Sequence, residues 1–393
     1  MATTKLTPRE VHDALNRVNW DFPGATTLES TVHSLHRFPG NFIPQIPSYL
    51  IQILSNQGDL VFDPFCGSGT TGIEAAILGR RVWHTDANRV SILVTEGKIA
   101  ALSDSTLRKD LTRLVQEFFW ILPNYRTQRA EQLRGGVNTE LSKWFHPDTL
   151  AQLHTIWRLI SSTTGAGTRA LLEMLFSDTL FACASTGQAL TSGGKPRRHH
   201  WGWIADNVRP NRLHWHNAER LFHERLVRAF KIVLTQPKLT KIDAKIQRQD
   251  IRRLSVKKPV VDLVVTSPPY LGMIDYALAN RLTYLWFDWP MDQDRELEIG
   301  ARFRRNRAAA DAEYLDSIDI AAKNISALLK GKGYCAVVIG ASRKFPGMAE
   351  KVVDQFGQYL TPISPPIKRS PSRRRVSDRK GSEFQELVCV FRK

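Results

Sequence analysis

Apolar and polar positions alternate along the first hundred residues in a way that predicts strands and helices in turn. A short apolar run at 60–62 closes on Asp63, and a second run at 81–85 closes on Asp86. Each run is followed by apolar residues at helical spacing, at 71–78 and at about 88–101. Strands and helices joined in this order by short turns form a mainly parallel sheet with helices on both faces. This part of the chain therefore predicts an α/β fold.

The middle of the chain interrupts this alternation. Helical spacing dominates between residues 102 and 240, in segments at 107–122, 148–160, 169–184 and 217–234. Strand patterns then return at 244–249, 260–265, 334–339 and 386–391, with a helix near 313–329. We predict that residues 1–101 and 241–393 are the two halves of one α/β domain. Residues 102–240 are predicted to be a largely helical insertion into that domain.

Length and composition indicate a globular protein. The chain has 393 residues, of which 42% are hydrophobic and 24% are charged. No apolar run is long enough to span a bilayer, and the N-terminus lacks the apolar stretch of a signal peptide. We therefore expect a cytoplasmic protein. The four cysteines form no CxxC spacing, and the pairs His33/His36 and His199/His200 lack further ligands, so neither a disulfide framework nor a metal site is expected.

The charge balance favours a polyanionic partner. Fifty-five Lys and Arg against 38 Asp and Glu give a net charge of +17. A protein of this charge gains affinity for a nucleic acid because each neutralised phosphate releases condensed counterions. The same charge also serves solubility, so the motifs must decide between the two interpretations.

The loop after the first strand has the features of a site for a small ligand. It reads DPFCGSGTT over residues 63–71, so an acid at the strand end is followed by two glycines and the start of a helix. Glycines at such a turn bring the backbone close to a ligand at the helix N-terminus. The third glycine of a dinucleotide site is missing. Asp63 suits an ammonium group and Asp86 suits a ribose diol, which together predict S-adenosylmethionine. The alternative is a tight structural turn beside an unrelated acid.

The motif TSPPY, at residues 266–270, has the chemistry to hold an exocyclic amine. Pro268 and Pro269 stiffen the backbone and donate no hydrogen bond, which leaves carbonyl oxygens and the Ser267 hydroxyl as acceptors. An amine needs such acceptors for its N–H groups so that its lone pair can be directed at a methyl group. Tyr270 offers an aromatic face on which a base can stack. A proline-braced turn with a core tyrosine is the structural alternative.

Together the two motifs resemble the DNA amino-methyltransferase family, in particular its cytosine-N4 branch. The resemblance covers roughly residues 30–100 and 240–393, and the middle only loosely. It implies a Rossmann-like S-adenosylmethionine-dependent methyltransferase fold with a mostly parallel sheet. The catalytic residues that it implies are Ser267, Pro268, Pro269 and Tyr270. The cofactor-binding residues are Phe42, Asp63, Phe65, Cys66, Gly67, Gly69, Thr70, Thr71, Asp86, Asp250 and Thr266.

The resemblance also narrows the reaction. Serine at the first catalytic position favours cytosine N4 over adenine N6. The motif order is closest to the family's alpha arrangement, although the insertion precedes the strand that ends at Asp250. Cytosine-C5 methylation needs a cysteine nucleophile, usually in a Pro-Cys pair, and the sequence contains no such pair.

We therefore predict a site-specific methyltransferase for cytosine N4 in double-stranded DNA. It would work in a restriction-modification or related system that could include a cognate endonuclease. Adenine-N6 methylation of DNA, amino-methylation of RNA and non-enzymatic nucleic-acid binding are the alternatives.

Two basic segments are predicted to contact the DNA. Both combine arginine with flexible or aromatic residues, which suits a loop that follows a groove and reads guanine edges. A solvated surface loop is the alternative for each. The predicted contacts are Lys195, Arg197, Arg198, Trp201 and Trp203 in the first segment and Arg373, Arg374 and Arg375 in the second.

Overall fold

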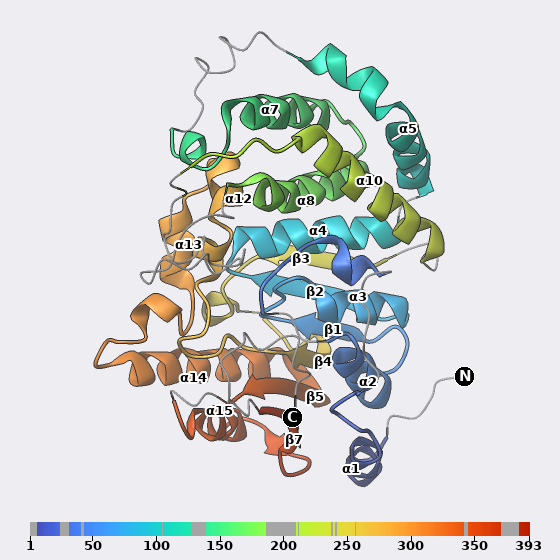
Figure 1. The fold of residues 1–393 in the computed structure, drawn as a ribbon. Coiled ribbons are helices and arrows are strands. Elements are labelled where there is room, and N and C mark those ends of the chain that lie inside the picture. The colour runs from blue at the N-terminus through green and yellow to red at the C-terminus, as the bar shows by residue number, and fades with distance from the viewer. Residues whose placement is uncertain are drawn as a thin grey trace.

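The strands of the chain form one eight-stranded sheet (Figure 1). The computed structural model describes residues 6–23, 31–40, 43–103, 105–126, 139–185, 210, 212–236, 239, 242–255, 257–341, 345–370 and 385–393. The strand order is β3-β2-β1-β4-β5-β8-β6, and β7 also pairs with β8. The strands are β1 (Leu60–Asp63), β2 (Arg81–Asp86), β3 (Ala244–Arg248), β4 (Val261–Thr266), β5 (Leu329–Gly340), β6 (Thr361–Pro362), β7 (Ile367–Arg369) and β8 (Glu386–Arg392).

The direction of the strands locates the place where a ligand can bind. Strands β3, β2, β1, β4 and β5 are parallel, whereas β8 is antiparallel to β5, β6 and β7. From β1 the chain moves outward to β2 and β3 and then returns to the other side of β1 as β4. In doubly wound sheets, ligands bind outside the carboxyl ends of the strands at this reversal. The turns after β1 and β4, which carry the two predicted motifs, both begin there.

Alternate residues of the central strands pack into two separate cores. Val61 and Val265 face the core beneath α2, α3 and α4, whereas Phe62 and Val264 face the core beneath α14 and α15. All six residues of β4 are buried, as expected for a central parallel strand that is covered on both faces. The helices of these layers are α2 (Gln45–Leu54), α3 (Thr70–Ile77), α4 (Arg89–Ser103), α14 (Ala310–Leu328) and α15 (Met348–Gly357).

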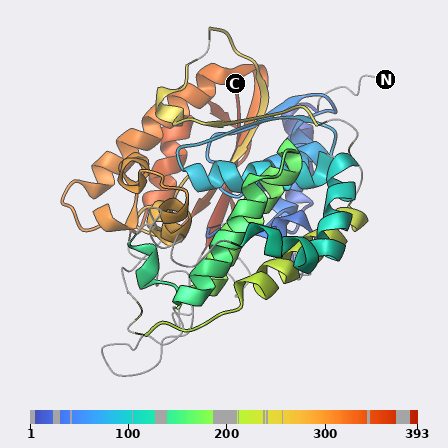
Figure 2. The same cartoon turned by 90° about the horizontal axis from the view of Figure 1, so that it is seen from above.

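The remaining described helices lie outside these two layers. Helix α8 packs on α4, and Figure 2 shows α8 and α10 side by side above it. The approach of α8 is close, because a Cβ at Gly97 would lie 2.6 Å from Cβ of Met174. These helices are α1 (Pro8–Asn16), α5 (Ser105–Ile121), α7 (Pro147–Ser161), α8 (Ala166–Cys183), α10 (Ala218–Thr235), α11 (Tyr276–Ala279), α12 (Arg281–Trp286) and α13 (Met291–Leu297).

The predicted α/β fold with helices on both faces of a mostly parallel sheet is confirmed, and most predicted elements agree within a few residues. One strand is longer than predicted. Strand β5 begins at Leu329, which pairs with Val261, rather than at Tyr334. The register shifts after this first pair, and Lys332 has a positive φ of 68°. The apolar pattern starts only beyond this irregularity, so the sequence conceals the first part of the strand.

Three tryptophans of the helical part of the fold contribute to the larger of the two cores. Trp157, Trp286 and Trp289 are partly buried and pack against the larger core, where the rings of Trp157 and Trp286 meet edge to face. None of the described helices is long and apolar enough to cross a membrane.

Candidate active site

The turn after β1 is held in shape by the strand beside it. Gly67 and Gly69 have positive φ values of 50° and 80°, which side chains other than glycine rarely adopt. The Gly67 N–H donates to Oδ2 of Asp86 at 2.9 Å, and the Cys66 N–H donates to the carbonyl oxygen of Thr85 at 3.1 Å. The turn is therefore tied to the carboxyl end of β2.

Asp63 links the same turn to β4. Its Oδ1 accepts from the Thr266 hydroxyl at 2.6 Å and from the Phe65 N–H at 3.1 Å. Its Oδ2 is buried and accepts no hydrogen bond from the described residues. Burial raises the pKa of Asp63 to about 6. Asp63 thus connects the turn after β1 to the end of β4, where the second motif begins.

The end of β2 presents polar groups at the level of this turn. Asp86 Oδ1 accepts from the Asn88 N–H at 2.9 Å, and burial raises the pKa of Asp86 to about 6. The Asn88 side chain accepts from the Val90 N–H at 2.8 Å through Oδ1, while its Nδ2 is buried with no partner among the described residues. Asn88 therefore offers a buried donor to a ligand.

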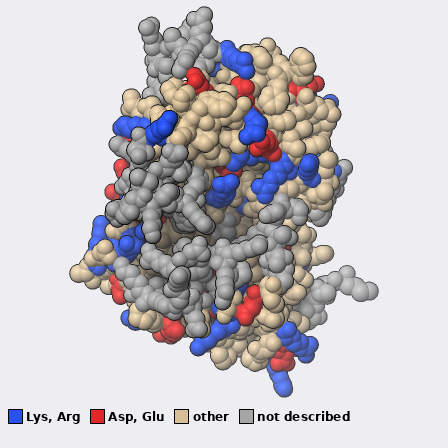
Figure 3. All heavy atoms as spheres, in the orientation of Figure 1, with Lys and Arg blue, Asp and Glu red and all other residues tan. Residues whose placement is uncertain are grey.

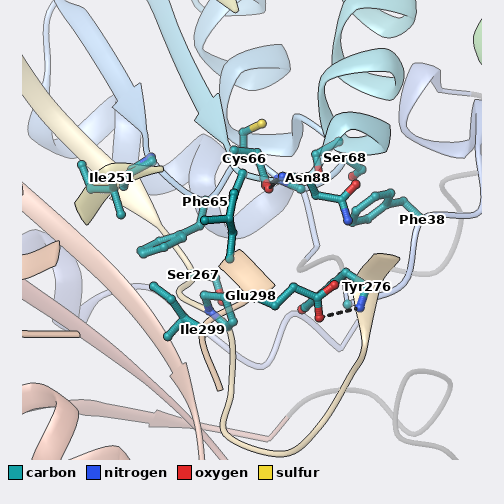
Figure 4. A pocket seen from close by; sticks show the side chains of 18 of the residues that line it. Phe38, Phe65, Cys66, Ser68, Asn88, Ile251, Ser267, Tyr276, Glu298 and Ile299 are labelled. Atoms are coloured by element: carbon teal, nitrogen blue, oxygen red, sulfur yellow. Dashed lines mark hydrogen bonds between the residues drawn. The ribbon is translucent and has the colours of Figure 1, made fainter. Parts of the chain in front are cut away.

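A cavity of about 810 Å³, part of it open to solvent, lies between these groups at the carboxyl ends of the strands. In Figure 4, Phe65, Ile251 and Ile299 stand on one side and Phe38, Ser68 and Asn88 on the other. The lining residues are Phe38, Pro39, Gly40, Pro64, Phe65, Cys66, Gly67, Ser68, Thr70, Asp86, Ala87, Asn88, Ser91, Gln249, Asp250, Ile251, Ser267, Pro269, Tyr276, Leu297, Glu298 and Ile299.

The structure divides the residues predicted from the sequence into two layers. The predicted residues that line the cavity are Phe65, Cys66, Gly67, Thr70, Asp86, Asp250, Ser267 and Pro269. Those that are not among the lining residues are Asp63, Gly69, Thr71, Thr266, Pro268 and Tyr270. Phe42 lies outside the described residues. Asp63 therefore belongs to the layer that shapes the turn, because its carboxylate is 1% exposed and engaged with β4.

The turn after β4 is braced from three sides. The Ser267 hydroxyl donates to the Tyr270 hydroxyl at 3.2 Å, and burial raises the pKa of Tyr270 well above its ordinary value. The Tyr314 hydroxyl of α14 donates to the carbonyl oxygen of Pro269 at 3.0 Å. The Gly272 N–H donates to the carbonyl oxygen of Gly300 at 2.7 Å. We call residues 267–272 the SPPY turn.

One wall of the cavity comes from a segment that the sequence motifs do not include. Leu297, Glu298 and Ile299 line the cavity immediately after α13. The Glu298 carboxylate accepts from the N–H groups of Tyr276 and Ala277, at 3.1 and 2.6 Å, and so caps α11. Burial raises the pKa of Glu298 to about 8. The short pattern ELEIG at 296–300 gave no signal of its own, since nothing in it distinguishes a cavity wall from a helix end.

Asp250 contributes to the cavity with its carboxylate already engaged. Its two oxygens accept from Nε of Arg252, both at 3.1 Å, and Oδ2 also accepts from Nη2 at 2.7 Å. Nη2 of Arg252 donates in addition to the carbonyl oxygen of Leu297 at 2.8 Å. Asp250 and Arg252 thereby join the end of β3 to the 297–299 wall.

Comparisons of the chain with known proteins indicate which family it resembles. A family model described as N6_N4_Mtase, DNA methylase, matches residues 6–96. The Type II methyltransferase M.MjaII of Methanocaldococcus jannaschii is 21% identical over 88% of this chain and 78% of that protein. The Type II methyltransferase M.MvaI of Kocuria varians is 22% identical over 74% of this chain and 67% of that protein. These matches support the assignment of the chain to the DNA amino-methyltransferase family.

The cofactor of this DNA methyltransferase is S-adenosylmethionine, as the match to the DNA methylase family model indicates. A solved TehB-like SAM-dependent methyltransferase from Corynebacterium glutamicum overlaps 98% of this chain and 100% of its own, with 10% identity and a TM-score of 0.33. The residues present do fit the cofactor, because the cavity combines apolar walls, the Asp86 carboxylate and the unpartnered Nδ2 of Asn88.

The cysteine in the glycine turn is unsuited to attack a base. Cys66 is 4% exposed, and its Sγ lies 3.7 Å from the Thr95 hydroxyl. In Figure 4 the sulfur points away from the cavity. Burial raises the pKa of the Cys66 thiol well above its ordinary value, so the thiolate is scarce at neutral pH. These features agree with an amino-methyltransferase rather than a cytosine-C5 enzyme.

The predicted DNA contacts lie outside the described residues. This holds for Lys195, Arg197, Arg198, Trp201 and Trp203 and also for Arg373, Arg374 and Arg375. Among the described residues no group of His, Cys, Asp and Glu is arranged to hold a metal ion. His33 instead contacts Glu74 at 2.8 Å, and His36 contacts the Ser177 hydroxyl at 3.0 Å.

Proposed function

We propose that this methyltransferase modifies the exocyclic N4 of cytosine within a specific sequence of double-stranded DNA. The observation that carries the proposal is the position of Ser267, whose side chain lines the cavity at the start of the SPPY turn. A neutral hydroxyl and the neighbouring carbonyl oxygens can accept hydrogen bonds from both N–H groups of an amine. An aspartate at this position would instead put a charge beside the amine.

In this proposal, different residues of the cavity bind the adenine, ribose and methionine parts of the cofactor. Phe65, Ile251 and Ile299 provide the apolar surfaces for the adenine ring. Asp86 and Asn88 hold the ribose hydroxyls through charge-assisted and amide hydrogen bonds. The methionine part lies on the opposite side, near Phe38, Ser68 and Thr70. When bound, the cofactor supplies an electrophilic methyl group on a sulfonium.

The SPPY turn would hold the target base outside the DNA stack. Unstacking costs a few kcal/mol, which stacking on Tyr270 and contacts to phosphates offset. The Ser267 hydroxyl and the Pro268 carbonyl oxygen accept from the amine and direct its lone pair toward the methyl group. The amine proton then leaves to solvent. Most of the rate acceleration in this scheme comes from positioning.

The two basic segments remain our proposed DNA contacts. Contacts of the described residues at their ends support this proposal. Arg369 and Glu386 form a buried ion pair at the base of residues 371–384, and Glu386 helps to raise the pKa of Tyr270, after burial. Glu386, which follows that segment, therefore interacts electrostatically with Tyr270 of the SPPY turn. Ser185, at the start of the other segment, accepts from the His214 N–H at 2.8 Å. Figure 3 shows Lys and Arg side chains beside a hollow near the centre of the face that it presents.

The larger context is also part of the proposal. Residues 1–101 and 241–393 form the methyltransferase domain and 102–240 recognise the target sequence. A restriction-modification system, with an endonuclease that cuts the unmodified sequence, is the setting that such site-specific methylation favours. The named relatives are Type II methyltransferases, which supports this setting.

Replacing Tyr314 by phenylalanine should slow methylation without weakening cofactor binding. The substitution removes only the hydroxyl that holds the Pro269 carbonyl oxygen. A net loss of one hydrogen bond, about 1 kcal/mol, predicts a rate about fivefold lower. Tyr359→Phe is the matched control, because its hydroxyl contacts Asp319 of the same helix. Single-turnover methylation and cofactor titration would be measured for both variants. An equal loss of cofactor affinity in Tyr314→Phe would contradict the proposed role.

The proposed reaction is tested by expressing the protein in a bacterial host that lacks DNA methylation. Single-molecule sequencing of the host DNA would then show which base is modified and in which sequence. We expect N4-methylcytosine in one sequence motif, absent when Tyr270 is replaced by alanine. N6-methyladenine would keep the family and overturn the choice of base. Unmodified DNA, with methyl transfer to RNA from the same cells, would overturn the DNA substrate.

A further inference from the structure

A lysine is fully buried directly behind the glycine turn. Lys98 lies on α4, and its side chain is 0% exposed. Its Nζ donates to the carbonyl oxygen of Ser68 at 3.1 Å. Within the described parts of the chain no carboxylate forms an ion pair with it. Burying an ammonium group without a counter-charge costs several kcal/mol, and one carbonyl oxygen offsets only part of that cost. In the ligand-free fold the protonated form of Lys98 therefore lacks a compensating negative charge.

The described lining of the cavity contributes negative charge only. It contains the carboxylates of Asp86, Asp250 and Glu298 and, among the described residues, no Lys or Arg. Asp86 and Glu298 therefore favour cationic or hydrogen-bond-donating parts of a ligand. An anionic part needs a cation from the next layer. Behind the lining on the Ser68 side, Lys98 lies one peptide unit from the cavity.

The groups around Ser68 and Lys98 include a neutral histidine, His36, and the hydroxyls of Ser68 and Thr70. Burial lowers the pKa of His36 to about 4, and Lys98 contributes to that lowering, so His36 is neutral. The Ser68 hydroxyl faces the Thr70 hydroxyl at 3.3 Å, and both residues line the cavity. Burial also lowers the pKa of Lys98 to about 7, as expected for an ammonium group in an apolar environment that lacks an anion.

We propose that Lys98 supplies the positive charge that attracts the carboxylate of the cofactor's methionine part. The attraction would act across the Ser68 peptide, which separates the Lys98 ammonium group from the cavity. The carboxylate would be held on the Phe38 and Ser68 side of the cavity, opposite the apolar adenine surfaces. Lys98 is thus a positioning residue for the cofactor and does not touch the reacting atoms. The proposal depends on the cofactor and not on which base is methylated, so it stands or fails separately from the proposed cytosine specificity.

The test uses two ligands that differ only in that carboxylate. S-adenosylmethionine and its decarboxylated form would be titrated into the full-length wild-type protein, Lys98→Met and Lys98→Gln, with calorimetric detection. Methionine keeps the length of the side chain without charge, and glutamine keeps a hydrogen-bond donor for Ser68. We expect both variants to lose at least about tenfold in affinity for S-adenosylmethionine and to bind the decarboxylated ligand as the wild type does.

Each other outcome overturns the proposal. Equal losses for both ligands would mean that Lys98 only supports the shape of the turn. Wild-type affinity in Lys98→Gln would mean that the hydrogen bond matters and the charge does not. Lys330→Met is the control, because Lys330 pairs with Asp262 away from the cavity lining. Thermal unfolding without ligand verifies folding, and Lys98→Met should unfold at the same or a higher temperature because an uncompensated buried charge is removed.

Discussion

Replacement of Tyr270 by alanine should lower the rate of methyl transfer by about 100-fold or more. The substitution removes the aromatic face proposed for the target base and the hydroxyl that accepts from Ser267. Cofactor binding should persist, because Tyr270 does not line the cavity that holds the proposed adenine and ribose positions. Single-turnover assays on a DNA duplex, with the cofactor titrated separately, measure the two effects.

Tyr270→Phe serves as the matched control for that experiment. It keeps the ring and removes only the hydroxyl, so it should retain a substantial part of the rate. If Tyr270→Ala methylated DNA at the wild-type rate, stacking on this ring would have no part in the reaction. Loss of cofactor affinity in Tyr270→Ala would instead assign the residue to the cavity.

Replacement of Gly69 by alanine should both destabilise the fold and weaken cofactor binding. Gly69 begins α3 with a φ of 80°, and a Cβ there would lie 2.8 Å from Oγ1 of Thr95. The left-handed conformation costs about 1–2 kcal/mol for a residue with a side chain, and the overpacking adds about 1–3 kcal/mol. The turn must shift to relieve the contact, which would move the Ser68 and Thr70 side chains that line the cavity.

Gly58 offers an unusually close control for Gly69. It has the same φ of 80°, but a Cβ there would meet nothing within 4 Å. Gly58→Ala should therefore show the conformational cost alone and bind the cofactor normally. Thermal unfolding and cofactor titration of both variants separate the two contributions. Equal destabilisation of the two variants would show that the contact with Thr95 is relieved without cost.

The two motifs could be predicted from the sequence because they are local. A strand that ends in an acid and turns through Gly67 and Gly69 specifies its own geometry, and the prolines at 268 and 269 do the same. The short turns that join β1, α3 and β2 then favour the parallel pairing of β1 with β2. Residues 60–86 and 260–270 therefore agree closely with expectation.

The parts that could not be predicted depend on contacts between distant segments. Glu298 reaches α11 over more than twenty positions in the sequence, and Asn88 is revealed as a donor only when its Nδ2 is buried. In the sequence, Lys98 is an ordinary polar position of a helix. Its burial depends on tertiary packing, which includes the contact of α8 with α4. The hydrogen bond that engages the Asp63 carboxylate also comes from a distant residue, Thr266, which is 203 positions away.

The contacts of α8 set a limit on how the proposed recognition region could be exchanged between relatives. Ser177 of α8 hydrogen-bonds to His36 and to Thr283, and Asp178 accepts from the Arg37 N–H at 3.1 Å. Chimaeras that swap residues 102–240 as a cassette would replace one side of each contact and leave Met174 unmatched to Gly97. A transferable recognition unit must therefore exclude α8, or carry α4 and the 36–37 segment with it.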